Sequence, residues 1–389
     1  MRITNVEAIH LRLPDVAELA DGTQDVLIVL VHTDEGVTGI GEVTSQSYVA
    51  KAVIEAPRSA QRRHGLRHIL VGQDPLDEGL WERMYHHTNR YGRRGVAIHA
   101  ISGADIALWD IRGKVLGLPI SELFGGPVRE GIPIYCHPND RSSIKDTVQH
   151  AKAIAATGQK SLKTDPWQPH HEEESNGYLT GKLSAEAENH GVDLIAAVRE
   201  AVGPDFEILI DCHARFDAPT AIRLARALEP YNIFWFEEPV PVESIHALKQ
   251  VRDHVGVPIC VGERIHTRWE FIPILENELA DFIMPDVTWT GGITEIKKIA
   301  TLAEAYYVPI SPHDASGPIN VLAGAHVMAS VPNHYRVETS RAKLNAYDVF
   351  IDHPLDIRGD KIYLSDRPGI GIELDKDYLH GHVLEGYGG

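Results

Sequence analysis

The sequence predicts an α/β fold in which a modified (β/α)8 barrel of the TIM type carries an N-terminal α+β capping domain. Three observations support this prediction. Strand-like runs precede helical patterns over residues 1–126, short apolar runs alternate with amphipathic stretches over 127–340, and several of those runs end in a carboxylate. Strands followed by helices are typical of α+β domains, and regular alternation is typical of α/β folds. We expect residues 341–389 to return to the capping domain as a C-terminal segment.

The composition is that of an ordinary globular protein. Of the 389 residues, 43% are hydrophobic and 24% are charged, and the formal net charge is −18. These values exclude disorder and fibrous repeats for the chain as a whole. The negative charge argues against nucleic acid or an anionic membrane as a partner. It is compatible with a small anionic substrate, because a bound cation can reverse the sign of a local site.

The three cysteines, Cys136, Cys212 and Cys260, match neither a zinc motif nor a disulfide framework. We expect buried, reduced thiols and a cytoplasmic location. The N-terminal residues lack the apolar core of a signal peptide. The early apolar run Val26–Val31 is too short to span a membrane. A homo-oligomer is the expected assembly, although no motif specifies it.

The capping domain is predicted to begin with a hairpin. The apolar run Val26–Val31 is followed by a turn signal at Asp34–Gly36 and by a second strand over Val37–Val43. Apolar residues then recur at helical spacing over residues 50–54, 75–88 and 96–116. Gly117 ends the last helix, and the glycines before Pro127 mark the predicted domain boundary.

The barrel is predicted from eight alternating units. Its strands are expected at Ile132–His137, Ser161–Trp167, Glu207–His213, Ile233–Val240, Pro258–Ile265, Phe282–Val287, Pro309–Asp314 and Tyr335–Thr339. Its helices are expected at 145–157, 188–202, 218–229, 243–255, 268–279, 293–306 and 318–329. This order is the signature of a (β/α)8 barrel. A doubly wound sheet is the alternative, but no G-x-G-x-x-G motif opens a helix after a strand here.

The polar stretch 168–189 follows the second predicted strand. It reads either as a solvated surface insertion or as a loop that partly covers the barrel mouth, where sites lie in this fold. In the C-terminal segment, Arg367–Ile372 has the composition of an ordered stretch, and we expect it to pack on the capping domain.

Three carboxylates stand at successive strand ends. Asp211, Glu237 and Glu263 follow the third, fourth and fifth predicted strands, and each step between them is 26 residues long. One βα unit per step places neighbouring strand ends side by side, so these groups are expected to converge at the C-terminal mouth. Clustered carboxylates need a counter-charge. An all-oxygen ligand set that leaves open positions points to Mg²⁺.

Two histidines stand out by position. His313 ends the seventh predicted strand beside Asp286 of the sixth, which indicates a dyad in which the carboxylate orients the imidazole and raises its basicity. His213 lies two residues beyond Asp211, on the same side of that strand, and no orienting carboxylate accompanies it in the motif.

Two further charged residues on predicted strands are candidates for the site, and Lys163 is expected to face the barrel interior. Lys163 on the second strand is a candidate for holding a substrate carboxylate, or else a barrel lysine paired with an acid. Glu338 on the eighth strand can hydrogen-bond a substrate carboxylate only if one partner is protonated. Its alternative is a structural ion pair.

These motifs together resemble the enolase superfamily, and within it the mandelate racemase-like subgroup. The segments that carry the likeness are SGADIALWDIRGKVLGLPISELFGG, IDCHARF, FEEPV, GERI, GGITE and PHDASGP. The last five are most similar to acid-sugar dehydratases, in particular galactonate dehydratase. The resemblance implies that Asp211, Glu237 and Glu263 hold Mg²⁺ and that His313, with Asp286, abstracts the proton α to the carboxylate.

The resemblance also implies a reaction. His213 would protonate the departing 3-hydroxyl, and Glu338 would help stabilise an enediolate on the way to a 2-keto-3-deoxy acid. The substrate would be an aldonate such as galactonate or gluconate, its stereochemistry read by capping-domain loops near residues 15–24 and 45–50. Racemases of this family carry a second catalytic lysine where Asp165 stands here, so racemisation is disfavoured. An epimerase, a cycloisomerase and a non-catalytic relative remain the alternatives.

Overall fold

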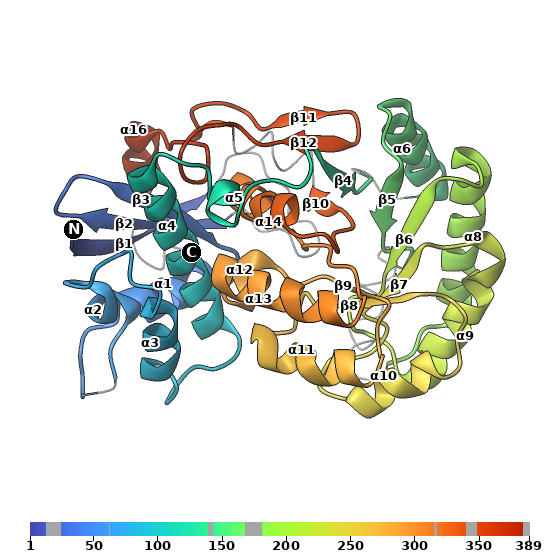
Figure 1. Ribbon diagram of the computed structural model, residues 1–389. Coiled ribbons are helices and arrows are strands. Elements are labelled where there is room, and N and C mark those ends of the chain that lie inside the picture. Colours follow the sequence, from blue (N-terminus) through green and yellow to red (C-terminus); the bar gives the residue numbers. More distant parts are fainter. Residues whose placement is uncertain are drawn as a thin grey trace.

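The computed structural model describes residues 1–12, 25–61, 63–138, 143–167, 181–314, 317–339 and 348–383. The N-terminal domain is a three-stranded antiparallel sheet of β1 (Ile3–Arg12), β2 (Asp25–Thr33) and β3 (Thr38–Val43), in that order. It packs against α1 (Ser47–Glu55), α2 (Leu66–Leu70), α3 (Leu80–His87) and α4 (Val96–Leu116), shown in blue to teal in Figure 1. The predicted hairpin is therefore confirmed, whereas the predicted helix 75–88 begins only at Leu80 and α2 was not predicted.

Close packing of β3 on α4 explains the two glycines of β3. A Cβ atom at Gly39 would lie 2.1 Å from the carbonyl oxygen of Ala107, and one at Gly41 would lie 2.0 Å from that of Gly103. No side chain fits at such distances, so glycine is required for this approach. The contact holds α4, the longest helix described, flat against the sheet.

The second domain is a parallel sheet whose strands alternate with helices, as predicted. Its strands are β4 (Ile132–Cys136), β5 (Ser161–Thr164), β6 (Glu207–Asp211), β7 (Trp235–Glu237), β8 (Ile259–Val261), β9 (Phe282–Ile283) and β10 (Val337–Thr339). Its helices are α6 (Ile144–Ala156), α8 (Ala185–Val202), α9 (Ala218–Leu228), η2 (Glu229–Tyr231), α10 (Ile245–Arg252), α11 (Thr267–Glu276), α12 (Val287–Thr290), α13 (Gly292–Ala305) and α14 (Pro318–Ser330). The short helix α5 (Ile120–Leu123) precedes this domain in the chain and contacts both α4 and α14.

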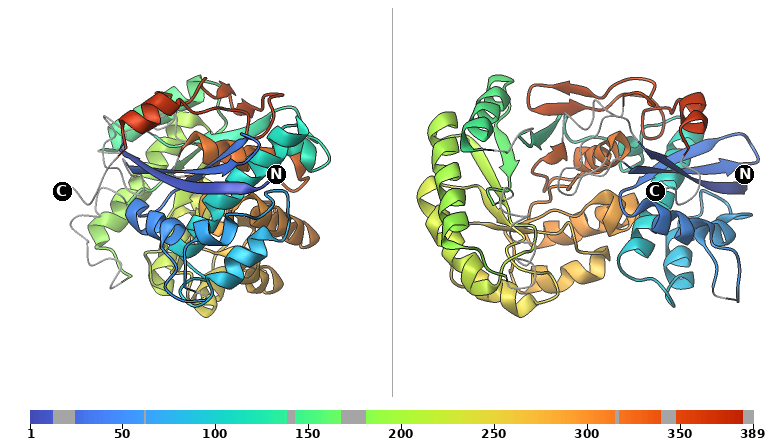
Figure 2. Two further views of the ribbon diagram at one scale, coloured as in Figure 1. Left: turned by 90° about the vertical axis from the view of Figure 1, so that its left-hand side faces the viewer. Right: turned by 180° about the vertical axis from the view of Figure 1, so that it is seen from behind.

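The strand order is that of a TIM-type barrel. Strands β4 to β9 pair in sequence, and β10 pairs in parallel with β4 on the other side. Over the described residues the seventh predicted strand forms single bridges rather than a ladder: Ile283 with Ile310, Asp286 with His313, and Ile310 with His334. The sheet is thus consistent with a barrel, although the named strands do not close a ring. Figure 2 shows the helices curving around its outside.

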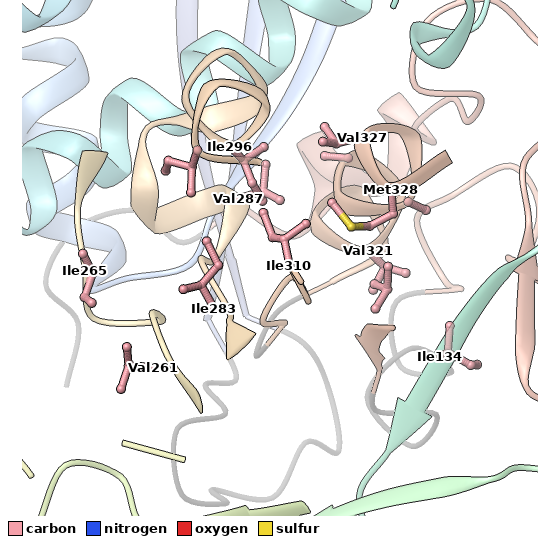
Figure 3. Packing of buried hydrophobic residues seen from close by; sticks show 14 of the residues in the cluster. Ile134, Val261, Ile265, Ile283, Val287, Ile296, Ile310, Val321, Val327 and Met328 are labelled. Atoms are coloured by element: carbon pink, nitrogen blue, oxygen red, sulfur yellow. The ribbon is translucent and has the colours of Figure 1, made fainter. Parts of the chain in front are cut away.

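The main core fills the layer between this sheet and its helices. Figure 3 shows Val261, Ile283 and Ile310 from the strand side facing Val287 and Ile296 from α12 and α13. Cys136, Cys212 and Cys260 are buried free thiols, as predicted. No helix among the described residues has the length and apolar character needed to cross a bilayer.

The C-terminal segment contacts both parts of the chain. The hairpin of β11 (Asp356–Arg358) and β12 (Lys361–Tyr363) adds to the sheet at β4. The backbone N–H of Ile370 then donates to Asp110 of α4 at 2.8 Å, and α16 (Lys376–Gly381) is followed by a bridge between Leu11 and Val383. The red segment in Figure 1 accordingly runs back over the blue sheet. The boundaries 1–126, 127–340 and 341–389 stay predictions.

The two domains meet at buried polar contacts of α4 and β3 with the barrel. Asp105 of α4 accepts hydrogen bonds from the backbone and hydroxyl of Thr294, at 2.8 and 2.6 Å. Glu42 of β3 is 1% exposed and accepts from the backbone N–H of Asn320, at 3.2 Å, in the first turn of α14. Burial, followed by the charge of Asp314, raises the pKa of Glu42 to about 8. Glu42 therefore docks against the barrel as a neutral acid.

We predict that Glu42→Gln removes a pH-dependent loss of stability. The pKa of Glu42 is about 8 in the folded protein against an ordinary value of 4.5, so folding favours its protonated form. The contribution of Glu42 to the free energy of unfolding is fully present below pH 4.5 and falls as the pH rises from 4.5 toward 8. Above pH 8 this contribution no longer changes. Relative to Glu42→Gln, the wild type should lose up to about 1.4 kcal/mol per pH unit within this window.

Thermal unfolding between pH 5 and 9 measures this difference. Glu276→Gln, at an exposed position of α11, is the matched control and should track the wild type. If stability depends on pH in the same way in the wild type and in Glu42→Gln, the assignment of a neutral Glu42 is contradicted.

Candidate active site

Three predicted carboxylates converge at the carboxyl ends of adjacent strands. Asp211 ends β6, Glu237 ends β7, and Glu263 follows β8 by two residues. The register of the parallel sheet sets Asp211 directly beside Glu237. All three side chains are buried, and one ligand oxygen from each lies within 4.8 Å of the others. The predicted convergence is confirmed.

The electrostatics of this cluster call for a cation. Burial, reinforced by Asp211, raises the pKa of Glu237 well above its ordinary value, and burial raises that of Glu263 to about 7. Burial acts in the same direction on Asp211, but the charges of His213 and Lys163 outweigh it and lower the pKa. Oε2 of Glu263 is buried and receives no hydrogen bond from the described residues. Oxygen donors with excess negative charge fit a hard divalent ion such as Mg²⁺.

Lys163 lies in the interior, as predicted, and is 1% exposed. Its Nζ lies 2.7 Å from Glu237 and 3.4 Å from Asp211. It also lies 3.0 Å from Glu338 on β10. All three ammonium donors therefore face carboxylates of the protein. This arrangement matches the ion-pair alternative and leaves the predicted contact with a substrate carboxylate untested.

Glu338 connects Lys163 to Tyr135 of β4 and to His137, which follows β4. Its Oε2 accepts from the hydroxyl of Tyr135 at 2.8 Å, and its Oε1 contacts Nε2 of His137. Burial acts to raise the pKa of Glu338, but Lys163, His313 and His137 together lower it well below the ordinary value. The carboxylate is thus held in its charged form at the centre of the barrel mouth.

His313 and Asp286 form the predicted pair. Nδ1 of His313 lies 2.7 Å from Oδ2 of Asp286, and the other oxygen of Asp286 is fixed by the backbone N–H and hydroxyl of Thr288. Nε2 of His313 faces Oε2 of Glu263 at 3.3 Å. Burial lowers the pKa of His313, but Glu263, Glu338 and Asp286 raise it to about 10. Such a value again reports uncompensated negative charge in the cluster.

His213 also has an orienting carboxylate, although none accompanies it in its own sequence motif. Its Nδ1 lies 3.0 Å from Oδ2 of Asp165, and its Nε2 lies 3.4 Å from Asp211. Arg215 in turn contacts both oxygens of Asp165, at 2.8 and 2.9 Å. His213 and Ala214 have φ of +51° and +56°, uncommon for residues with a side chain. This turn directs His213 back over the end of β6.

Sequence reasoning missed Asp165, Arg215, Tyr135 and His137 as members of the site. A usable signal was present for two of them. Asp165 lies two residues beyond Lys163, and His137 lies two residues beyond Tyr135, so each pair occupies one side of its strand. In the sequence, Asp165 stands out only because it occupies the position of the second lysine of the racemases. The structure gives that position a role in holding His213.

A row of rings connects the site to the capping domain. The ring of Trp289 in α12 lies 5.3 Å from that of His313 and 5.7 Å from that of His99 in α4. Nε2 of His99 lies 3.1 Å from Nε2 of His266, and its Nδ1 lies 3.0 Å from the hydroxyl of Ser45. The predicted specificity loop 45–50 therefore begins beside the site and continues into α1. The other predicted loop, 15–24, and most of the stretch 168–189 lie outside the described residues.

Comparisons with known proteins agree with this architecture. Residues 4–125 match the family described as the mandelate racemase/muconate lactonizing enzyme N-terminal domain, and residues 146–378 match the enolase C-terminal domain-like family. D-xylonate dehydratase of Haloferax volcanii is 33% identical over 95% of this chain and 88% of its own length. D-mannonate dehydratase of Sphingomonas sp. is 32% identical over 90% of each chain.

A solved structure is similar over nearly the whole fold. The 3,6-anhydro-D-galactonate cycloisomerase of Zobellia galactanivorans superposes with a TM-score of 0.84 at 30% identity, covering 99% of this chain and 100% of its own. Both family matches fall on the two domains described above, and they cover most of the sequence. This chain belongs to the mandelate racemase/muconate lactonizing enzyme family of the enolase superfamily.

Proposed function

We propose that this protein is a Mg²⁺-dependent hydro-lyase that dehydrates an acid sugar, an aldonate such as galactonate or gluconate, to a 2-keto-3-deoxy acid. One observation carries the proposal. Two imidazoles, each tied through Nδ1 to a buried carboxylate, direct Nε2 toward the same carboxylate cluster. Dehydration needs one group to remove a proton and another to protonate a leaving hydroxyl. The dehydratases among the relatives favour the same reaction.

The three clustered carboxylates, Asp211, Glu237 and Glu263, would hold the ion. When bound, Mg²⁺ would neutralise negative charge that develops on the substrate carboxylate, which is usually a large contribution to such reactions. Lys163 adds fixed positive charge beside Glu237 and Asp211. Glu338 is held in a defined position, next to the carboxylate cluster, by Lys163, Tyr135 and His137.

His313 is suited to act as the base. Its Nδ1–H donates to Asp286, so Nε2 is the nitrogen that takes the proton α to the carboxylate. His213 is suited to act as the acid, because Asp165 holds Nδ1 and leaves Nε2 to deliver a proton. The substrate loses its α-proton to His313 and its β-hydroxyl as water with the proton from His213. The enol that remains tautomerises to the keto acid.

The alternatives share the first step but differ in the second. An epimerase would return a proton to the α-carbon, and a racemase needs a base on each side of it. Asp165, bound to His213 and Arg215, is committed to other contacts here.

Cycloisomerisation is the second candidate, because a similar structure is a cycloisomerase. A non-catalytic relative would not need both imidazole–carboxylate pairs and all three ligands. A cytoplasmic location and a homo-oligomeric assembly belong to the same proposal.

We predict that activity depends on a divalent cation. Protein treated with a chelator should convert no member of a panel of aldonates, and added Mg²⁺ should restore formation of a 2-keto-3-deoxy acid, followed by a keto-acid assay. Asp211→Asn should lose the Mg²⁺-induced rise in melting temperature as well as activity. Full turnover by chelated protein without metal would overturn the mechanism. Epimer formation without keto acid would favour the alternative.

Lys163→Met is expected to abolish most activity and to lower stability. The substitution keeps the aliphatic stem but leaves Glu237, Asp211 and Glu338 without their shared cation, and an unpaired buried charge typically costs about 3–5 kcal/mol. The loss in melting temperature should be smaller in Mg²⁺ than in chelator, since the ion offsets part of the charge. Equal losses in the two conditions, with activity retained, would assign Lys163 a purely structural role.

The two histidines should be separable by isotope exchange. In D₂O, His313→Asn should show neither exchange of the α-proton nor product, followed by NMR. His213→Asn should lose dehydration by about 10²-fold or more, as expected for removal of a general acid. It should retain α-exchange if His313 releases its proton to solvent before returning it. Asp165→Asn should weaken dehydration in the same direction as His213→Asn. Exchange in His313→Asn would make another group the base.

A further inference from the structure

A pocket of about 750 Å³ opens on the capping domain, and none of its lining residues belongs to the carboxylate site. It lies between α1 and the segment that follows α3, in the blue part of Figure 1. The lining residues are Val49, Ala52, Val53, Ala56, Pro57, Ser59, Arg63, His64, Arg90 and Tyr91. Its volume falls in the range of small-molecule sites, roughly 300–1,000 Å³.

One side of this pocket is apolar and exposed. Val49 of α1 is 46% exposed and Tyr91 is 45% exposed, both among the largest values for bulky apolar side chains of the described residues. Ala52, Ala56 and Pro57 add small apolar surface beside them. An exposed apolar patch set among polar groups often marks a binding surface.

The rim carries positive charge without acidic partners. Arg63 and Arg90 are both exposed, and neither forms an ion pair within the described part of the chain. Other surface arginines do: Arg83 lies 2.9 Å from Asp77, and Arg252 lies 2.6 Å from Asp281. In a chain with a net charge of −18, two unpaired guanidinium groups at one pocket are a local reversal of charge.

A buried polar atom lies at the same pocket. His64 is 6% exposed, and its Nδ1 has no hydrogen-bond partner among the described residues. Its backbone carbonyl accepts from the hydroxyl of Tyr91 at 2.7 Å, which fixes the histidine relative to the rim. A buried nitrogen without a partner carries a desolvation cost, which a hydrogen bond to a ligand group would offset.

From these observations we propose that the pocket binds a small organic anion with an apolar body, outside the reaction site. Its carboxylate or phosphate would pair with Arg63 and Arg90, because guanidinium groups match both anions in geometry. Its apolar part would lie on Val49 and Ala52, and His64 would supply the inner polar contact. The proposal is independent of the acid-sugar reaction.

The probe for this site is 8-anilinonaphthalene-1-sulfonate, which combines an aromatic body with a sulfonate. We expect saturable binding of about one probe per chain by fluorescence titration. Arg63→Gln with Arg90→Gln should weaken binding at least tenfold, and Ala52→Trp should abolish it by filling the pocket. Lys145→Gln, an exposed charge change on α6, is the control and should bind as the wild type does. Unchanged melting temperatures would establish that the variants fold.

Displacement of the probe identifies the anion. Octanoate and octyl phosphate distinguish a carboxylate from a phosphate, and octanol, which lacks charge, should displace at least tenfold more weakly than the better of the two. Equal displacement by octanol would overturn the charge-based proposal, as would equal probe binding by the double variant. Sedimentation velocity completes the test. If the double variant dissociates an oligomer of the wild type, the pocket is an interface between copies and the proposal fails.

Discussion

The site depends on the burial of four carboxylates around a single ammonium group. Asp211, Glu237 and Glu338 contact Lys163, while Glu263 lies outside its reach and faces His313. Charges buried in this way are expensive unless they are paired and hydrogen-bonded. Lys163, together with Arg264, which contacts Glu263, cannot balance four acids, and burial together with this excess negative charge accounts for the raised pKa values of Glu237, Glu263 and His313. A divalent cation would remove it. The excess charge that makes the cluster unfavourable by itself is thus what would give it affinity for a hard ion.

The two imidazoles are oriented by the same kind of contact, a buried carboxylate at Nδ1. Asp286 holds Nδ1 of His313, and Asp165 holds Nδ1 of His213. Each carboxylate is itself fixed, by Thr288 in the first case and by Arg215 in the second. Because Nδ1 is occupied in both rings, both Nε2 atoms are committed to the cluster side. The two imidazoles differ in their surroundings, which is the basis for proposing His313 as the base and His213 as the acid: Nε2 of His313 faces Glu263, whereas Nε2 of His213 lies beside Asp211 at the turn after β6.

The features predicted correctly are those that recur at equivalent positions in successive βα units. Asp211, Glu237 and Glu263 occupy equivalent positions in successive βα units, so the spacing alone places them together. The features that were missed depend on register and side-chain length across strands. The Asp165–His213 contact joins the loops after two strands through a pair of positive-φ residues, which no periodicity reveals. The seventh strand is reduced to single bridges because Pro309 and Pro312 lack the N–H groups that a ladder needs. Helix α2, only five residues long, gives too short a pattern to recognise.

The same turn of the chain, the first turn of α14, contacts both the capping domain and the carboxylate that holds His313. The backbone N–H of Asn320 donates to Glu42 of the capping sheet, while its side-chain Nδ2 donates to Asp314 at 2.9 Å and lies 3.3 Å from Asp286. On the other side of His313, Trp289 donates from its indole to the carbonyl of Thr44 and packs against His99. A shift of the capping domain would therefore move both supports of His313 together. Under the proposed function, the binding energy of a substrate held between the domains would align His313 as the proposed base, so that the domain contact would belong to the catalytic apparatus.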